Sequence, residues 1–279
     1  LGPTAAGQRL TMAQASAAPS PATNAAPRAG TLFNPVAAID GLPFTHREND
    51  FVDFDRERLI PQMLSTEGPA MAVGDVNGDG LDDVYIGGAK EQAGALFVQR
   101  SDGRFLATSA STFEGDAISE DVGATFLDAD GDGDQDLFVV SGGNEFSDMA
   151  PALQDRLYRN DGRGNFTKAL DAIPAESVAG SRPAAADYDG DGDVDLFVGG
   201  RVVPWRNGES PTSALLRNDG RGRFTDVTAQ LASELQRIGM VTDAAWEDVD
   251  GDGRRDLVVV GEWMPVSVFR NIGAGRLTP

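Results

Sequence analysis

The nine residues DYDGDGDVD, from Asp187 to Asp195, and the apolar run LFVGG that follows them decide the fold of this chain. Three further copies stand along the sequence at similar spacing: DVNGDGLDD from Asp75, DADGDGDQD from Asp128 and DVDGDGRRD from Asp248. Those copies are followed by VYIGG, LFVVSGG and LVVVG. Alternating carboxylates with glycine at the turn are how a short peptide surrounds a hard cation such as Ca²⁺ with oxygen atoms. The pattern therefore predicts four metal loops, each running into a β-strand.

An EF-hand loop begins in the same way, but it takes a bidentate acidic ligand from position 12 and lies between two helices. Position 12 is apolar in all four copies here: Ile86, Val139, Val198 and Val259. Position 9 is acidic in all four, and a β-type run follows it at once. The loops are therefore predicted to join two strands of a hairpin and to take their closing ligand from position 9.

We assign side-chain ligands to positions 1, 3, 5 and 9 and a backbone carbonyl ligand to position 7. The first two predicted sites are Asp75, Asn77, Asp79, Leu81 and Asp83, and Asp128, Asp130, Asp132, Asp134 and Asp136. The other two are Asp187, Asp189, Asp191, Asp193 and Asp195, and Asp248, Asp250, Asp252, Arg254 and Asp256. The first site has an amide in place of one carboxylate, so we expect it to bind most weakly. The alternative, that DG-rich segments are only solvated turns, is disfavoured by four copies in phase.

A second motif keeps step with the loops: RSDGRF ending at Phe105, RNDGRGNF at Phe166, RNDGRGRF at Phe224 and RNIGAGRL at Leu277. Asn-Asp-Gly between apolar residues indicates a second hairpin in each unit. Two hairpins make four strands in each unit, and repeated short units of four strands are typical of β-propeller blades. We therefore predict an all-β fold with about four blades.

On these motifs the chain resembles the FG-GAP and VCBS repeat proteins, whose blades also form the head of the integrin α subunit. GDVNGDGLDDVYIGG and LLRNDGRGRFTDVT are most similar to the bacterial group related to cartilage acidic protein and associated with ASPIC/UnbV domains. The resemblance covers residues 45–279. It implies structural Ca²⁺, about four ions, and a part of a larger, seven-bladed propeller. It specifies fold and metal more closely than function.

Composition and charge limit the organisation of the chain, its class of partner and its location. Ala, Pro, Gly, Ser and Thr dominate the N-terminal part of the chain, so residues 1–44 are predicted to be a flexible linker and entry segment. The net charge of −21 disfavours nucleic-acid binding, which needs Lys and Arg against phosphate. No apolar stretch is long enough for a transmembrane helix. Open oxygen sites suit millimolar calcium, so we expect an extracellular, cell-surface or periplasmic location, with the signal sequence outside these residues.

No catalytic constellation emerges from the sequence. His46 is the only histidine, so neither a His-based triad nor a His-rich zinc site can form, and a structural role is expected for it. Paired aspartates of the glycosidase kind are conceivable, but the loops account for most of them. An enzyme acting on polysaccharide therefore stays an alternative to a binding module.

The segments that follow the post-loop strands are predicted to emerge opposite the metal loops. They carry Phe146, Trp205 and Trp263, with Arg201 and Arg206 beside Trp205, and these five residues are the candidate ligand face. Aromatic packing between blades is the competing interpretation, above all for Trp246. Residues 224–240 are predicted to contain a short connecting helix, and residues 51–65 an entry segment against the first blade.

The sequence thus predicts a calcium-stabilised, monomeric interaction or adhesion module within a larger chain, with a protein or glycan ligand. A purely structural domain of a surface complex is the third hypothesis. Calcium is expected to fix the hairpins, so that the segments on the opposite face are presented rigidly.

Overall fold

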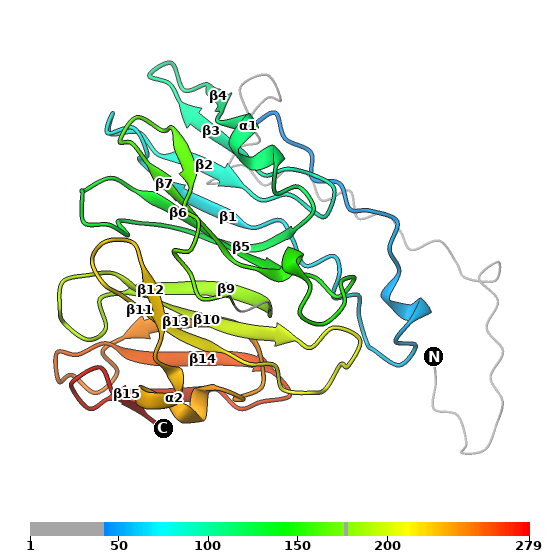
Figure 1. The fold of residues 1–279 in the computed structure, drawn as a ribbon, viewed down its shortest axis with the longest axis vertical. Helices are drawn as coiled ribbons and strands as arrows, with labels where there is room; N and C mark the ends of the chain where they lie inside the picture. The colour runs from blue at the N-terminus through cyan, green and yellow to red at the C-terminus, as the bar shows by residue number, and fades with distance from the viewer. Residues whose placement is uncertain (1–41, 176–177) are drawn as a thin grey trace, which may run out of the picture. The chain divides into compact units, whose positions relative to one another are not determined.

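The computed structural model describes residues 42–175 and 178–279, so most of the predicted linker, residues 1–41, lies outside the described residues. Sixteen strands of the described part form four antiparallel sheets of four strands each, in sequence order (Figure 1). The first two sheets contain β1 Met71–Gly74, β2 Asp83–Ile86, β3 Ala95–Gln99 and β4 Phe105–Thr108, and then β5 Glu120–Leu127, β6 Asp136–Gly142, β7 Arg156–Asn160 and β8 Phe166–Lys168. The other two contain β9 Ala179–Ala186, β10 Asp195–Val202, β11 Ala214–Asn218 and β12 Phe224–Asp226, and then β13 Met240–Glu247, β14 Asp256–Glu262, β15 Ser267–Asn271 and β16 Leu277–Thr278.

The sheets follow one another as blades. The first strand of each sheet lies beside the first strand of the next, in the order β1, β5, β9 and β13. Each acidic loop joins the first and second strands of its blade, and each second motif joins the third and fourth. The predicted all-β fold with four propeller blades is confirmed.

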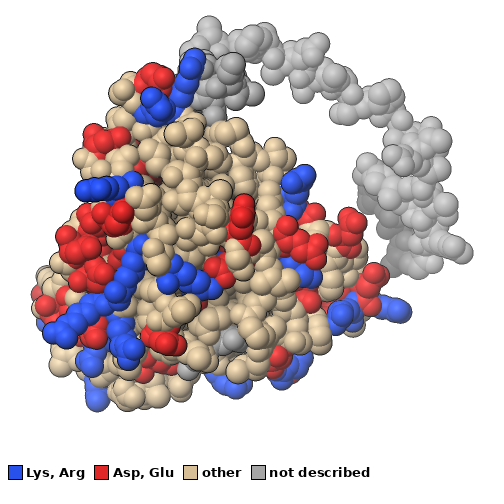
Figure 2. All heavy atoms as spheres, turned by 45° about the horizontal axis from the view of Figure 1, so that its top comes forward, with Lys and Arg blue, Asp and Glu red and all other residues tan. Residues whose placement is uncertain are grey.

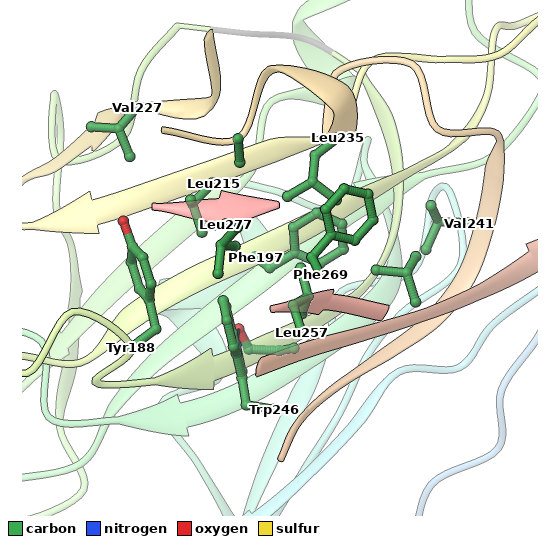
Figure 3. Packing of buried hydrophobic residues seen from close by; sticks show 13 residues of the cluster. Tyr188, Phe197, Leu215, Val227, Leu235, Val241, Trp246, Leu257, Phe269 and Leu277 are labelled. Carbon is green, nitrogen blue, oxygen red and sulfur yellow. Dashed lines mark hydrogen bonds between the residues drawn. The ribbon is translucent and has the colours of Figure 1, made fainter. Parts of the chain in front are cut away.

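The core lies between the blades rather than within them. Three buried clusters fill the spaces between blades one and two, two and three, and three and four. Figure 3 shows the last of these, where Trp246 stacks on Tyr188 with ring centroids 5.3 Å apart and donates its indole N–H to the Ala184 carbonyl at 3.1 Å. The predicted packing of Trp246 between blades is thereby confirmed. Because neighbouring blades cover both faces of a central strand such as β6, its sequence is a continuous apolar run instead of an alternating one.

Short helices complete the blades: α1 Ala110–Glu114, α2 Thr228–Leu231, and the 3₁₀ turns η2 Asp53–Asp55, η3 Pro151–Leu153 and η4 Ser233–Leu235. The connection over residues 224–240 differs from the single helix predicted. It begins as strand β12 and continues as α2 and η4, separated at Ala232, whose backbone is not helical. Buried Leu235 anchors this connection in the core between blades three and four.

Residues 42–70, here called the covering segment, do not lie against the first blade alone as predicted. They cross the ends of all four blades opposite the acidic loops, on the right-hand side of Figure 1. Arg47 contacts blade one, Asp53 blade two, Glu57 blades two and three, and Gln62 blade four. The reason is that the segment carries polar side chains whose partners stand on the β6–β7 and β10–β11 connections. Its Leu64 fills a small apolar cluster with Phe146, Leu153, Ala179 and Val202.

Candidate metal centres in the acidic loops

Each acidic loop is closed by the aspartate at position 1. Its two carboxylate oxygens accept the backbone N–H groups of the glycines at positions 4 and 6, at 2.7 to 3.1 Å, in all four copies. The glycine at position 6 has φ between +82° and +99°, a conformation that a side chain would strain. Burial raises the pKa of Asp75, but the amide hydrogen bonds outweigh it and lower the pKa overall. Asp75 therefore remains charged while it shapes the loop.

Carboxylates converge within these loops. In the described residues, three compact groups have carboxylate oxygens within 4.8 Å of one another: Asp128, Asp130 and Asp136; Asp187, Asp189 and Asp195; and Asp248, Asp250 and Asp256. Oδ1 of Asp130 and Oδ2 of Asp195 are buried and lack a hydrogen-bond partner. Like charges at this spacing repel one another unless a cation or a proton intervenes. The donor set, oxygen atoms alone, fits a hard divalent cation.

The aspartate at position 9 is buried in all four blades. One oxygen accepts the backbone N–H of a third-strand residue at 2.8 Å, as Asp136 does from Asn160. In blades one, two and four the other oxygen accepts the N–H of position 2. Burial raises the pKa of Asp136 to about 6 and that of Asp195 to about 7, against these hydrogen bonds. Position 9 therefore links the loop to the body of the blade.

The first and fourth loops differ most in charge, although Arg159 also lies 3.6 Å from Asp130 in the second loop. In the first, the amide of Asn77 stands at position 3 and donates to Asp79 at 3.2 Å, so this loop offers fewer carboxylates. In the fourth, Arg254 pairs with Asp252, and Arg270 approaches Asp250 at 3.3 Å. The fourth loop therefore already holds positive side chains at two of its predicted ligands; Arg254 belongs to the loop itself, whereas the approach of Arg270 is not visible in the loop sequence.

Position 7 connects the loop to the second hairpin of the same blade. The N–H of Leu81, Asp134, Asp193 and Arg254 donates to the position 5 carboxylate at 2.9 to 3.0 Å. The side chains of Asp134 and Asp193 lie so close to Gly162 and Gly220 that a Cβ on either glycine would stand 2.4 to 2.5 Å from a carboxylate oxygen. Gly162 and Gly220 also have φ of +72° and +67°, and this left-handed conformation by itself favours glycine in both RNDG sequences. Figure 2 shows acidic side chains gathered on the left-hand side of the molecule, with Lys and Arg among them.

The asparagine of the second motif joins neighbouring loops. Nδ2 of Asn160, Asn218 and Asn271 donates to the carbonyl at position 2 of the preceding blade's loop: Val76, Ala129 and Tyr188, at 2.6 to 2.8 Å. The same Nδ2 also donates to the residue before position 9 of its own loop, at 3.1 to 3.3 Å. We call this arrangement the asparagine bridge. The sequence shows the repetition of this asparagine, but Asn before Asp-Gly predicts only a turn.

The five candidate ligand-face residues divide into two groups. Phe146 is 8 % exposed and packs in the cluster with Leu64, so for this ring the packing alternative holds. Arg201 is also buried, and its guanidinium forms two hydrogen bonds to Glu67, at 2.6 and 2.8 Å. Both are corrections to the predicted face, because the covering segment lies over them.

The other three ligand-face residues are exposed. Trp205 is 38 % and Trp263 78 % exposed, both with positive φ, and Arg206 pairs at the surface with Asp148 and Glu209. The guanidinium of Arg56 lies 4.2 Å from the centroid of the Trp205 ring. A Cβ on Gly208 would stand 3.4 Å from the ring of Trp263, so the blade-three connection passes close to the aromatic residue of blade four.

A family model described as FG-GAP-like repeat matches residues 75–139 and 128–198. Residues 75–198 contain two FG-GAP-like repeats. Each match starts at position 1 of an acidic loop and ends shortly after position 9 of the next. The fourth loop, which the family model does not match, makes the same closing hydrogen bonds as the other three. Placement in the bacterial group named above stays a prediction.

No curated protein matches this chain. Among solved structures, one similar chain is the Trypanosoma rangeli sialidase in complex with sialic acid. The identity is 13 %, the TM-score is 0.36, and the likeness covers 76 % of this chain but only 30 % of the sialidase. At this TM-score the likeness supports no conclusion about activity. None of the helices in the described residues is long and apolar enough to cross a membrane.

Proposed function

We propose that this chain is a calcium-stabilised binding module of the extracellular space, cell surface or periplasm. The observation that carries the proposal is the convergence of carboxylate oxygens in the loops, with two buried oxygens unpartnered. Such sites are completed by a hard cation, and Ca²⁺ accepts six to eight oxygens in flexible geometry. Residues 45–279 act as one repeat array in this proposal, and residues 1–44 as a linker.

Calcium has a structural role here. Bound between positions 1, 3, 5 and 9, it neutralises the repulsion that opposes each loop. In the second, third and fourth loops position 9 also accepts the N–H of the bridging asparagine, and that asparagine reaches the preceding loop, so each of these three ions supports the junction with the preceding blade. Calcium binding is therefore coupled to the order of the blades.

Ligand binding is assigned to the opposite ends of the blades. Trp205 and Trp263 are large aromatic residues held outward by tight turns with φ of +63° and +56°. Exposed aromatic residues of this size are frequent anchors in binding surfaces. Glycan or protein ligands both suit a surface that also carries Arg206, whereas the net charge of −21 opposes nucleic acid.

Calorimetric counting of Ca²⁺ tests the metal part of the proposal. The chelator-treated chain is expected to bind about four ions, and Asp191→Asn to lose one of them. Asp219→Asn, at an exposed hairpin position outside the loops, is the matched control and keeps the full number. A chain that takes up no calcium contradicts the proposal.

The ligand face has its own test. An array of glycans, probed with the calcium-loaded chain, is expected to give signals that Trp263→Ala removes. A ligand that Trp263→Ala binds as tightly as the unaltered chain would place recognition elsewhere.

A further inference from the structure

A small cavity of about 230 Å³ lies between the first strands of blades two, three and four. Its lining comes from β5, β9 and β13, together with Arg201 of β10 and Glu67 of the covering segment. A Cβ on Gly123 would stand 2.6 Å from the carbonyl oxygen of Ser181, so β5 and β9 approach each other closely here. Sites for drug-sized ligands begin at about 300 Å³. The cavity therefore suits one small ring or the end group of a longer ligand.

Each of the three first strands is bulged where it lines the cavity. The pairing of β5 with β6 skips Val122, and the pairing of β13 with β14 skips Thr242. In the pairing of β9 with β10, one residue of Ser181 and Arg182 is extra. Bulges are frequent beside active sites, where they change the direction of a side chain. Three bulges around one cavity distinguish it from a simple gap in the packing.

The guanidinium of Arg201 has an unused donor. Its side chain is 6 % exposed and donates two hydrogen bonds to Glu67, at 2.6 and 2.8 Å, and one to Glu262 at 3.1 Å. These bonds use Nε and Nη2, whereas Nη1 is buried and has no hydrogen-bond partner among the described residues. A buried donor without a partner costs free energy, which a bound acceptor would recover.

Arg182 brings a second guanidinium to the cavity. It is exposed, and in the described part of the chain its side chain forms neither an ion pair nor a hydrogen bond. The two arginines balance Glu67 and Glu262, so this place does not share the negative excess of the chain as a whole. A planar guanidinium binds a carboxylate through two parallel hydrogen bonds. The cavity therefore offers donors for one carboxylate.

Acceptors for hydroxyl groups stand beside the arginines. The hydroxyl of Ser181 donates to the carbonyl of Gly199 at 3.1 Å, and that of Thr242 to the carbonyl of Val260 at 3.4 Å. Both hydroxyl oxygens keep lone pairs that accept hydrogen bonds, and the carboxylate of Glu67 accepts further ones. The lining thus combines donors for a carboxylate with acceptors for several hydroxyl groups.

We propose that this cavity binds a uronic acid, a sugar whose carboxylate accepts hydrogen bonds from Arg182 and Arg201 while its hydroxyl groups donate to the acceptors beside them. A neutral sugar lacks the group that pairs with the arginines. An amino acid adds an ammonium group, but Glu67 and Glu262 already pair with Arg201. The cavity shares no residue with the acidic loops or the exposed tryptophans, so the site is independent of the proposed calcium function.

Calorimetric titration with galacturonate and glucuronate tests the site, and galactose and glucose, which lack the carboxylate, are the matched ligands. At least one uronate is expected to bind at least about tenfold more tightly than its neutral sugar. Arg182→Gln should remove this preference, whereas Arg217→Gln, the same change at an exposed position of β11, should keep it. The proposal is overturned if neither uronate binds, if Arg182→Gln binds as tightly as the unaltered chain, or if glycine binds as tightly as the uronates.

A second measurement needs no variant. Crystals of the unaltered chain grown with the tighter-binding uronate are expected to show the sugar in the cavity, with its carboxylate against Arg182 and Arg201. A sugar bound elsewhere, or a cavity without sugar, overturns the proposal.

Discussion

The side-chain amide of Asn160 donates a hydrogen bond to the carbonyl oxygen of Val76 at 2.7 Å, across the boundary between blades one and two. The backbone N–H of Asn160 donates at the same time to Asp136, at position 9 of its own loop. One residue thus connects two acidic loops that belong to different repeats of the sequence. The equivalent bonds of Asn218 and Asn271 repeat this connection at the next two boundaries.

Removal of an asparagine bridge is therefore expected to destabilise the chain. Asn218→Ala leaves the buried carbonyl of Ala129 and the half-buried carbonyl of Val194 without their donor, and a buried unpaired polar group costs about 1 to 3 kcal/mol. Urea unfolding with calcium present measures the loss. Asn165→Ala, an exposed asparagine of a second-motif hairpin, should change the free energy of unfolding by less than about 0.5 kcal/mol. Equal stability of the two variants would refute a bridging role.

Stability without calcium is expected to fall as pH rises. The folded-state pKa of Asp195 is about 7 and that of Asp136 about 6, above the value of 3.8 for a free aspartate. Below pH 3.8 both states are protonated, but between about pH 4 and 7 the unfolded chain ionises freely while the folded chain resists ionisation. The free energy of unfolding that Asp136 and Asp195 contribute in their protonated form is therefore lost as pH rises through this window.

Excess Ca²⁺ should offset that loss, because the ion replaces the proton. Chemical unfolding at pH 4.5 and 7.5, in chelator and in calcium, measures both effects. Asp195→Asn should show a smaller pH dependence in chelator than the unaltered chain. A chelated chain whose stability increases over the window would contradict the predicted sign.

The fourth loop is expected to bind calcium more tightly once its internal cation is removed. Arg254 pairs with Asp252 and must release it before the ion binds. An exposed ion pair contributes about 0.2 to 1 kcal/mol, so Arg254→Ala should tighten this site by a factor of about 1.4 to 5. Calorimetry resolves the change, and Arg276→Ala, an exposed arginine in the connection from β15 to β16, serves as control. Weaker calcium binding by Arg254→Ala would indicate that Arg254 assists the loop.

The covering segment is expected to depend on Asp53. Its carboxylate accepts hydrogen bonds from the hydroxyl of Ser65 at 2.6 Å and from Asn144 at 2.8 Å, fully buried. Asp53→Ala leaves these donors unpaired, at a cost of about 1 to 3 kcal/mol each before relaxation. Limited proteolysis should then cut residues 42–70 faster, whereas Asp55→Ala, at an exposed neighbour, should not accelerate it. Equal cleavage of the two variants would contradict the docking described.

Much of this architecture could be predicted from the sequence because it is repeated and local. The alternating aspartates, the glycines with positive φ and the apolar runs fix each loop and its two strands within one short stretch of chain. The run LFVVSGG lacks the alternation of apolar and polar residues that would distinguish the two faces of a strand, because neighbouring blades cover both faces. The recurrence of such runs after each loop nevertheless predicts the number of blades.

The contacts that could not be predicted are those between distant segments. The partner of Asn160 is 84 residues away in the sequence, so its role as a bridge has no local sign. Phe146 and Arg201 look like surface residues in their own segments, but distant residues, among them Leu64 and Glu67, pack against them. The charge competition in the fourth loop likewise depends on Arg270, which the third strand brings back to the loop.

Thermal unfolding with and without calcium tests the central claim, that metal in the acidic loops holds the blades together. The melting temperature is expected to rise with calcium concentration. At a calcium concentration about one hundred times the dissociation constant, each site should add about 2.7 kcal/mol to the free energy of unfolding. It should fall on addition of chelator and recover when calcium is restored. A melting temperature that is the same in chelator and in excess calcium would contradict the account.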